Sequence, residues 1–169
     1  LNTLGGALSI NMKNGFNSEG HHLKAYGGSF GRWLLSVESG GNKGKFSYYA
    51  NAQYFDEEGW RELSPSFAGN FYASVGWKSQ LSEMNVNFQH GDTELTGNGP
   101  LPVELLASDR QTIFTAPDIT ENNMSMISLD GTHSLSQDLQ FSGNIFFRRN
   151  LTDSFNGDGS EFLICNLGT

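Results

Sequence analysis

The sequence predicts an all-β protein built as an antiparallel up-and-down meander. Three observations favour this class. Short segments alternate apolar and polar residues with a period of two, which is the pattern of strands with two different faces. The chain of 169 residues contains 21 Gly but only 4 Pro, and 12% of its residues are aromatic, a composition that suits strands better than helices. Links of two length classes separate the alternating segments in a regular order.

Seven alternating segments follow one another with almost no helical pattern between them. The two most regular are residues 70–80 and 84–90, and in the first of them Phe71, Val75 and Trp77 share one side. We expect strands over residues 23–27, 33–38, 45–55, 70–80, 84–90, 127–133 and 139–147. One helix is predicted, over residues 103–109, inside a long loop.

The segment KFSYYANAQYF, residues 45–55, illustrates the alternation. One side of this strand is apolar and the other is polar, so the strand lies between two environments. The apolar side carries Phe46, Tyr48, Ala50, Ala52 and Tyr54, and the polar side carries Ser47, Tyr49, Asn51 and Gln53. The apolar side either packs into a core or faces lipid.

The links between the predicted strands fall into two groups. After a short corner at residues 27–31, the tight links are residues 41–44, 80–83 and 135–138, and the long ones are residues 56–69 and 93–123. In an up-and-down meander every second link lies at the same end of the sheet. We therefore expect the short links at one rim and the long links, with Trp60, at the other, as in outer-membrane barrels.

A soluble β-sandwich also alternates and is the competing architecture. The polar sides of the strands are rich in Asn, Gln, Ser, Gly and Tyr rather than Lys, Glu and Thr, which favours a water-filled or plugged lumen. Aromatic residues lie near strand ends, as at the two interfaces of a membrane. They are Trp33, Phe46, Tyr54, Phe71, Trp77 and Phe147. In a barrel, Phe71, Val75 and Trp77 point away from the concave side of the sheet.

Composition argues against several other classes. The formal net charge is -8 and no segment concentrates Lys and Arg on one face, so no nucleic-acid partner is expected. The single cysteine, Cys165, forms neither an internal disulfide nor a cysteine-based metal site. No apolar run is long enough to predict a transmembrane helix. Because the first residue is Leu and not Met, we expect a section of a longer protein.

Neither a metal site nor a catalytic site is expected. His21 and His22 are adjacent, and adjacent residues of a strand point to opposite faces, so they do not bind one metal ion together. His90, near Asp92, is interpreted as an interfacial or lumen residue. The chain lacks a nucleophile elbow, a zinc-protease motif and a phosphate-binding loop. We therefore predict no enzyme activity and no cofactor.

Several motifs together resemble one family. LGGALSINMKNG resembles the end of the plug domain of TonB-dependent outer-membrane receptors. The first barrel hairpin of those receptors is similar to GGSFGRW, their second outer loop to YFDEEGWRELSPS and their third outer loop to LTGNGPLPVELL. The next outgoing strand with its loop resembles GNIFFRRNLTDSFNGDGSEF. Each motif alone is weakly specific. Their succession in the order of the family, from Leu4 to about Phe162, is more specific.

The resemblance implies an N-terminal plug inside a barrel of about 22 strands. Residues 1–15 would end the plug, and residues 16–169 would supply about seven strands of the barrel. The implied function is energy-coupled uptake of a scarce nutrient, such as an iron-siderophore, cobalamin or glycan, across the bacterial outer membrane. The implied partners are outer-membrane lipid, the nutrient, and the TonB complex through a segment upstream of this chain. A passive porin-like channel and a soluble β-sandwich carbohydrate-binding module are the alternatives.

The candidate ligand-binding residues lie in the two outer loops, residues 56–67 and 93–123. Within them we select Trp60, Arg61, Arg110 and Phe114, because aromatic and cationic side chains suit aryl or anionic ligands.

The number of strands predicts how this chain folds by itself. The diameter of a barrel is tied to its strand number, so seven strands of a large barrel do not close without changing tilt and shear. We therefore expect an open, curved antiparallel sheet with free edges near residues 23–27 and 139–147. Unpaired strand edges invite association in water.

Overall fold

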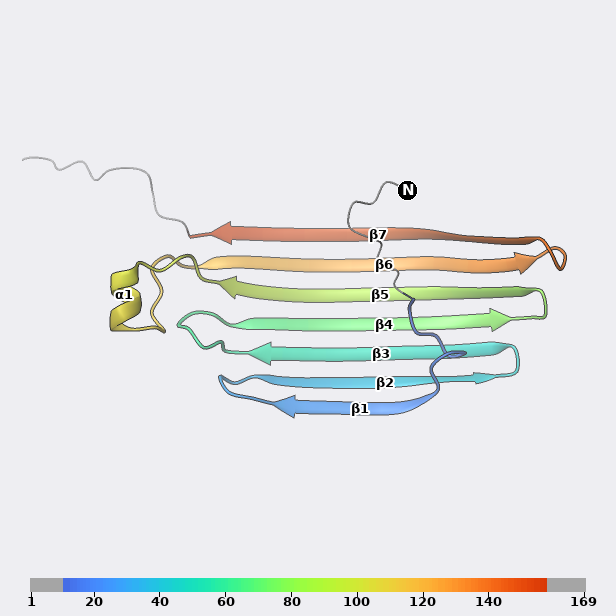
Figure 1. The fold of residues 1–169 in the computed structure, drawn as a ribbon, viewed down its shortest axis with the longest axis horizontal. Coiled ribbons are helices and arrows are strands. Elements are labelled where there is room, and N and C mark those ends of the chain that lie inside the picture. The colour runs from blue at the N-terminus through green and yellow to red at the C-terminus, as the bar shows by residue number, and fades with distance from the viewer. Residues whose placement is uncertain (1–10, 158–169) are drawn as a thin grey trace, which may run out of the picture.

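The computed structural model describes residues 11–157, which form seven strands and one short helix (Figure 1). The strands and the helix are β1 Gly20–Gly27, β2 Trp33–Lys43, β3 Phe46–Glu57, β4 Ser66–Lys78, β5 Ser82–Gly97, α1 Val103–Ser108, β6 Asp118–Ser134 and β7 Gln140–Asn156. The helix confirms the predicted one, and Asp109 is its C-cap.

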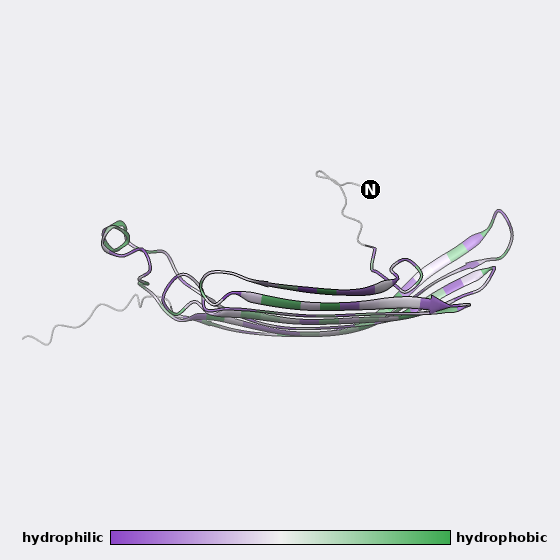
Figure 2. Ribbon diagram, turned by 90° about the horizontal axis from the view of Figure 1, so that it is seen from below, coloured by the Kyte–Doolittle hydropathy of each residue, from purple (hydrophilic) through white to green (hydrophobic). Residues whose placement is uncertain are grey.

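All seven strands form one sheet in the order β1-β2-β3-β4-β5-β6-β7, and every neighbouring pair is antiparallel. Within residues 11–157 no pairing joins β1 to β7, so the sheet has two free edges. Figure 2 shows that the sheet is curved. The predicted fold, an open and curved up-and-down sheet, is confirmed.

The links follow the predicted arrangement of the rims. In Figure 1 the links β2–β3, β4–β5 and β6–β7 lie at one end of the sheet, and α1 lies at the opposite end with the links β3–β4 and β5–β6. We call these ends the short-turn rim and the long-loop rim. The tightest link consists of Gly44 and Lys45, because Lys43 and Phe46 are paired directly. Gly44 has φ 63, a left-handed conformation that glycine adopts without steric cost and that two-residue hairpin turns require.

The strands extend further toward the long-loop rim than the alternation predicts. The prediction of a loop over residues 93–123 is wrong at both ends, because β5 continues to Gly97 and β6 begins at Asp118. The other long loop is also shorter than predicted, since β4 begins at Ser66. In the extensions of β5 and β6 both faces are mostly polar, with Thr93 and Asn122 on one face and Glu94 and Glu121 on the other. A strand with two polar faces gives no period-two signal.

The two faces of the sheet differ in chemistry. On one face, which we call the outward face, mostly apolar side chains lie in register across the strands. They include Leu23, Leu35, Tyr48, Phe71, Val75, Val86, Leu129 and Ile145. The opposite face, which we call the concave face, carries mostly polar side chains. They include Ser47, Asn51, Ser74, Asn85, Asn87, Ser128 and Asn144.

The sheet has almost no apolar core. Leu34 and Tyr49 are the only buried hydrophobic residues in the described part of the chain, whereas Phe71 is 41% exposed and Val75 is 60% exposed. As predicted, Phe71, Val75 and Trp77 lie on the outward face and not between two packed sheets. No helix within residues 11–157 is long and apolar enough to cross a membrane.

This architecture predicts the behaviour of the chain by itself. With the apolar outward face and the edges of β1 and β7 free, residues 1–169 should associate in aqueous buffer and become monodisperse in detergent. Sedimentation velocity with and without detergent measures this. A stable monomer in detergent-free buffer would contradict it.

Candidate functional site

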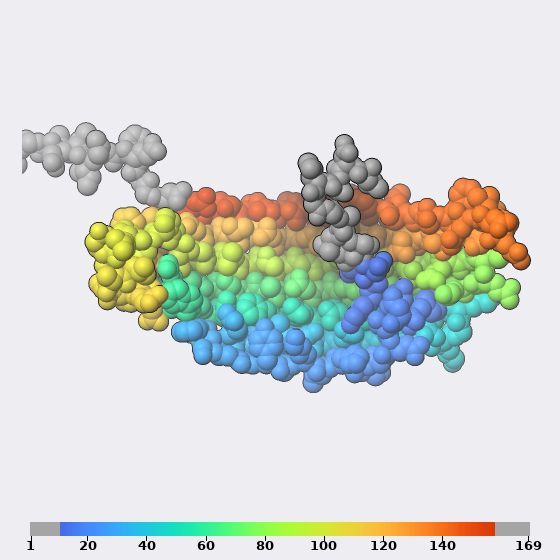
Figure 3. Space-filling model, viewed as in Figure 1, coloured from blue at the N-terminus to red at the C-terminus, as the bar shows by residue number. Residues whose placement is uncertain are grey.

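Residues 11–19, which precede β1, lie across the concave face. Figure 3 shows them as the dark blue patch on the face that it displays. The hydroxyl of Tyr72 donates to the carbonyl oxygen of Lys13 at 2.9 Å, and Nδ2 of Asn42 donates to the carbonyl oxygen of Gly15 at 3.2 Å. The ammonium group of Lys13 pairs with the carboxylate of Glu38 at 2.8 Å. The segment is therefore held on β2 and β4 by backbone and side-chain contacts together.

Glycine makes this close approach possible. A Cβ atom at Gly15 would overlap the carbonyl oxygens of Tyr48 and Gly41, and one at Gly40 would overlap the carbonyl oxygen of Ser18. A Cβ at Gly76 would lie 2.9 Å from the ring of Phe16. The segment thus packs directly on the backbone of the sheet, a role that only glycine allows at these positions.

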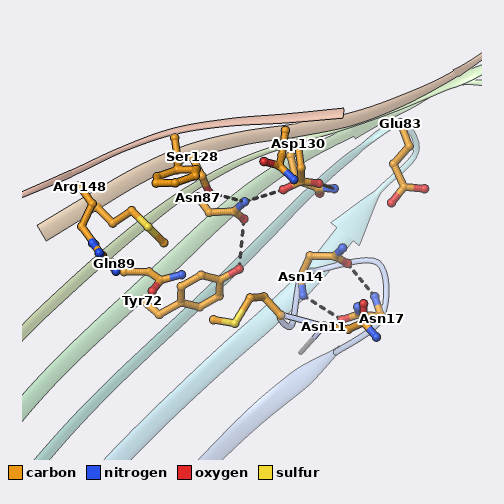
Figure 4. A pocket seen from close by; sticks show the side chains of 15 residues that line it. Asn11, Asn14, Asn17, Tyr72, Glu83, Asn87, Gln89, Ser128, Asp130 and Arg148 are labelled. Atoms are coloured by element: carbon orange, nitrogen blue, oxygen red, sulfur yellow. Dashed lines mark hydrogen bonds between the residues drawn. The ribbon is translucent and has the colours of Figure 1, made fainter. Parts of the chain in front are cut away.

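A polar cavity of about 760 Å³ lies beside this segment, between it and the concave face of β4 to β7. Figure 4 shows Tyr72, Asn87, Ser128 and Asp130 lining the same space as Asn14 and Asn17. Amide groups dominate the lining. They belong to Asn11, Asn14, Asn17, Asn85, Asn87, Gln89 and Asn144.

Asn87 is the centre of a hydrogen-bond network in the cavity wall. Its Nδ2 donates to Asp130 Oδ1 at 2.7 Å and to Ser128 Oγ at 3.2 Å, and its Oδ1 lies 3.1 Å from the hydroxyl of Tyr72. Asn85 Nδ2 donates to the other oxygen of Asp130 at 3.1 Å. These bonds fix side chains that are largely removed from solvent, while the buried Oδ1 of Asn85 has no partner within the described residues. The wall therefore offers ordered amides and hydroxyls to a hydrated or hydrogen-bonding solute.

Three of the four histidines lie on the outward face, each hydrogen-bonded to a serine directly opposite on the next strand. The Nδ1 to Oγ distances are 3.0 Å for His21 and Ser39, 2.9 Å for His90 and Ser125, and 2.7 Å for His133 and Ser82. On β5 the apolar residues Met84, Val86 and Phe88 lie between Ser82 and His90. The pairs therefore mark both limits of an apolar band on the outward face.

This band is slanted relative to the strands. On β1 and β2, the limit of the band nearest the short-turn rim lies at His21 and Ser39. Following the pairings from β2 through β3 and β4 to β5, Ser39 is in register with Phe88. On β5 the band continues for six residues beyond Phe88, to Ser82 and its partner His133. The limit thus moves by six residues between the His21–Ser39 pair of β1 and β2 and the Ser82–His133 pair of β5 and β6, which are four strand spacings apart.

The selected loop residues all lie at the long-loop rim. The guanidinium carbon of Arg61 lies 4.9 Å from the centre of the Trp60 ring, and Trp60 is 47% exposed. Arg110 and Phe114 are exposed in the neighbouring loop, residues 98–117, and make no hydrogen bond or ion pair with Trp60 or Arg61 in the described part of the chain.

Gln111, which the sequence does not single out, joins the two loops. Its side-chain Nε2 donates to the backbone carbonyl oxygen of Trp60 at 3.1 Å, and its backbone carbonyl oxygen accepts from the backbone N–H of Glu62 at 3.0 Å. A glutamine in a loop does not indicate from the sequence that it contacts a second loop.

Within residues 11–157 no group of three or more His, Cys, Asp or Glu is arranged to hold a metal ion. Residues 1–10, most of the predicted end of the plug, and Cys165 lie outside the described residues. Comparison with protein-family models, curated proteins and solved structures found no match to this chain.

The contact of residues 11–19 with the sheet predicts the effect of a single methyl group. Gly15→Ala should displace the segment and cost about 1–3 kcal/mol, because the added Cβ overlaps backbone that does not move easily. Gly143→Ala is the matched control, since a Cβ there meets nothing within 4 Å. Trypsin cleavage after Lys13 reports the displacement. Equal cleavage in both variants would contradict the packing.

Proposed function

We propose that this chain is a section of a TonB-dependent outer-membrane receptor that takes up a scarce nutrient in an energy-coupled way. The observation that carries the proposal is the contrast between the two faces of one sheet. An apolar face is exposed, and a polar face opposite to it holds a preceding segment of the same chain. Lipid on one side and a filled lumen on the other account for both faces.

The slant of the apolar band supports lipid as the neighbour of the outward face. With a rise of about 3.4 Å per residue and about 4.8 Å between strands, six residues over four spacings correspond to a tilt of about 45°. Strands of outer-membrane barrels cross the bilayer at about 35–45°. A band that follows a membrane plane should be slanted by this angle, whereas the interface with a second aligned sheet follows the strands more closely.

In the proposed mechanism, the loops at the long-loop rim capture the nutrient. Trp60 and Arg61, and Arg110 and Phe114 in the adjacent loop, supply aromatic and cationic groups for this step. Residues 1–15 belong to the plug, residues 16–169 to the barrel wall, and the TonB complex pulls on a segment upstream of both. The amide-lined concave face then forms part of a hydrated path for the nutrient. The segment seated on this face favours a gated receptor over a passive porin-like channel.

The lipid contact is testable on two adjacent residues of β7. Ile145 is 68% exposed on the outward face, and Asn144 lines the cavity on the concave face. In the complete protein, with Cys165→Ser, we expect a bimane label at Ile145→Cys to be quenched by lipids brominated on their acyl chains. The same label at Asn144→Cys should be insensitive to these lipids. Quenching of both labels by aqueous iodide would instead place both faces of the strand in water.

The uptake function predicts a second result. Replacing Trp60 and Arg61 together by Ala should weaken nutrient uptake about fivefold or more, as expected when an aromatic and cationic anchor is removed. Leu135→Ala, an exposed residue at the short-turn rim, is the control. The measurement is uptake of radiolabelled ferric siderophores, cobalamin and oligosaccharides by cells, with and without a protonophore. Uptake that is insensitive to the protonophore would indicate a passive channel.

A further inference from the structure

The outward face changes character directly beyond the apolar band on its long-loop side. There Phe88, Ile127 and Phe147 end the band on β5, β6 and β7. The next residues outward in register are His90, Ser125 and Arg149. These three residues, the boundary row, lie side by side on three neighbouring strands.

The boundary row consists of hydrogen-bond donors. Ser125 bonds Nδ1 of His90 at 2.9 Å, and when the serine donates in this bond the proton of the imidazole resides on Nε2. None of the three ion pairs in the described part of the chain includes Arg149. A guanidinium group and a histidine–serine pair thus lie side by side just beyond the apolar band.

Carboxylates begin beyond the boundary row. The first is Asp92, one row further toward the long-loop rim. One row beyond that, Glu94, Glu121 and Asp153 lie opposite one another. Along β5 the order is therefore apolar, then donor, then acidic, whereas on β7 Leu151 lies between Arg149 and Asp153. A bilayer presents acyl chains, then headgroup phosphates, then water in the same order.

The opposite limit of the band lacks this arrangement. There the row is Ser82, His133 and Phe141, with an aromatic residue on β7 where the boundary row has Arg149. Of the two limits of the band on β5, β6 and β7, only the long-loop limit therefore carries a guanidinium group.

We propose that the boundary row binds the phosphate headgroups of the lipid leaflet at the long-loop rim, with Arg149 as the principal contact. The proposal rests on the proposed function, because it needs the outward face to lie in a bilayer. Arginine is suited to this contact because its planar fork donates two hydrogen bonds to one phosphate. The His90 imidazole, whose Nε2–H is free when Ser125 donates to Nδ1, extends the same donor surface to an adjacent headgroup.

The neighbouring residue provides a matched control. Arg148 carries the same charge on the same strand, but it faces the cavity on the concave side. Arg149→Gln and Arg148→Gln thus remove the same charge at adjacent positions, one in contact with lipid and one in the lumen.

The test uses the complete protein reconstituted into vesicles of phosphatidylcholine with or without phosphatidylglycerol. A bimane label at Phe147→Cys, with Cys165→Ser, lies one row inside the boundary row. Quenching by brominated phosphatidylglycerol against brominated phosphatidylcholine gives the relative affinity for the anionic headgroup. Arg149→Gln should lower this preference about fivefold, the equivalent of ~1 kcal/mol for one basic residue at an anionic surface. Arg148→Gln should leave it unchanged.

Several outcomes would overturn the inference. An unchanged preference in Arg149→Gln would show that Arg149 has another partner, such as a carboxylate on an adjoining strand. An equal loss in Arg148→Gln would show a general effect of charge. Competition by inorganic phosphate at equal concentration would indicate a site for the free anion. In each case bromolipid quenching of the wild-type label still supports insertion, whereas absence of quenching by either lipid would argue against the proposed function.

Discussion

The backbone ladder of one continuous sheet is the interaction on which the rest of this structure depends. Only two hydrophobic residues are buried in the described part of the chain, so the strands are held by hydrogen bonds to their neighbours and by contacts between side chains in register. A ladder of this kind leaves unpaired backbone groups at β1 and β7. The outward face remains exposed as well. Both features require a surrounding that covers them, and this requirement gives the chain its proposed place in a larger barrel.

Part of the concave face is covered by the chain itself. Some of its polar groups bond one another, as Asn87 does to Asp130 and Ser128, and others bond the preceding segment, as Tyr72 does to Lys13. The buried oxygens Ser47 Oγ, Ser74 Oγ and Asn85 Oδ1 have no partner within the described residues. Gly15, Gly40 and Gly76 let that segment lie directly on the sheet. The concave face and the preceding segment are thus fitted to each other at the level of single atoms.

The sequence predicted the features that depend on neighbouring residues and missed those that depend on distant ones. The alternation at Phe71, Val75 and Trp77 indicated the outward face correctly, because a strand places every second side chain on the same side. It failed for residues 93–97 and 118–123, where both faces of the strand are mostly polar. The bonds of Gln111 to the other loop and of Asn42 to Gly15 join segments far apart in the chain, and no local pattern encodes them. The slant of the apolar band needs the register of every strand pair.

Strand tilt is the quantity that tests the central claim most directly. Polarised infrared spectroscopy of the complete protein in oriented bilayers reports the angle between its strands and the membrane normal. A lipid-facing band with the observed slant requires a tilt of about 45°, since the band must follow the membrane plane. Strands without preferred orientation, or strands parallel to the membrane plane, would contradict a transmembrane outward face.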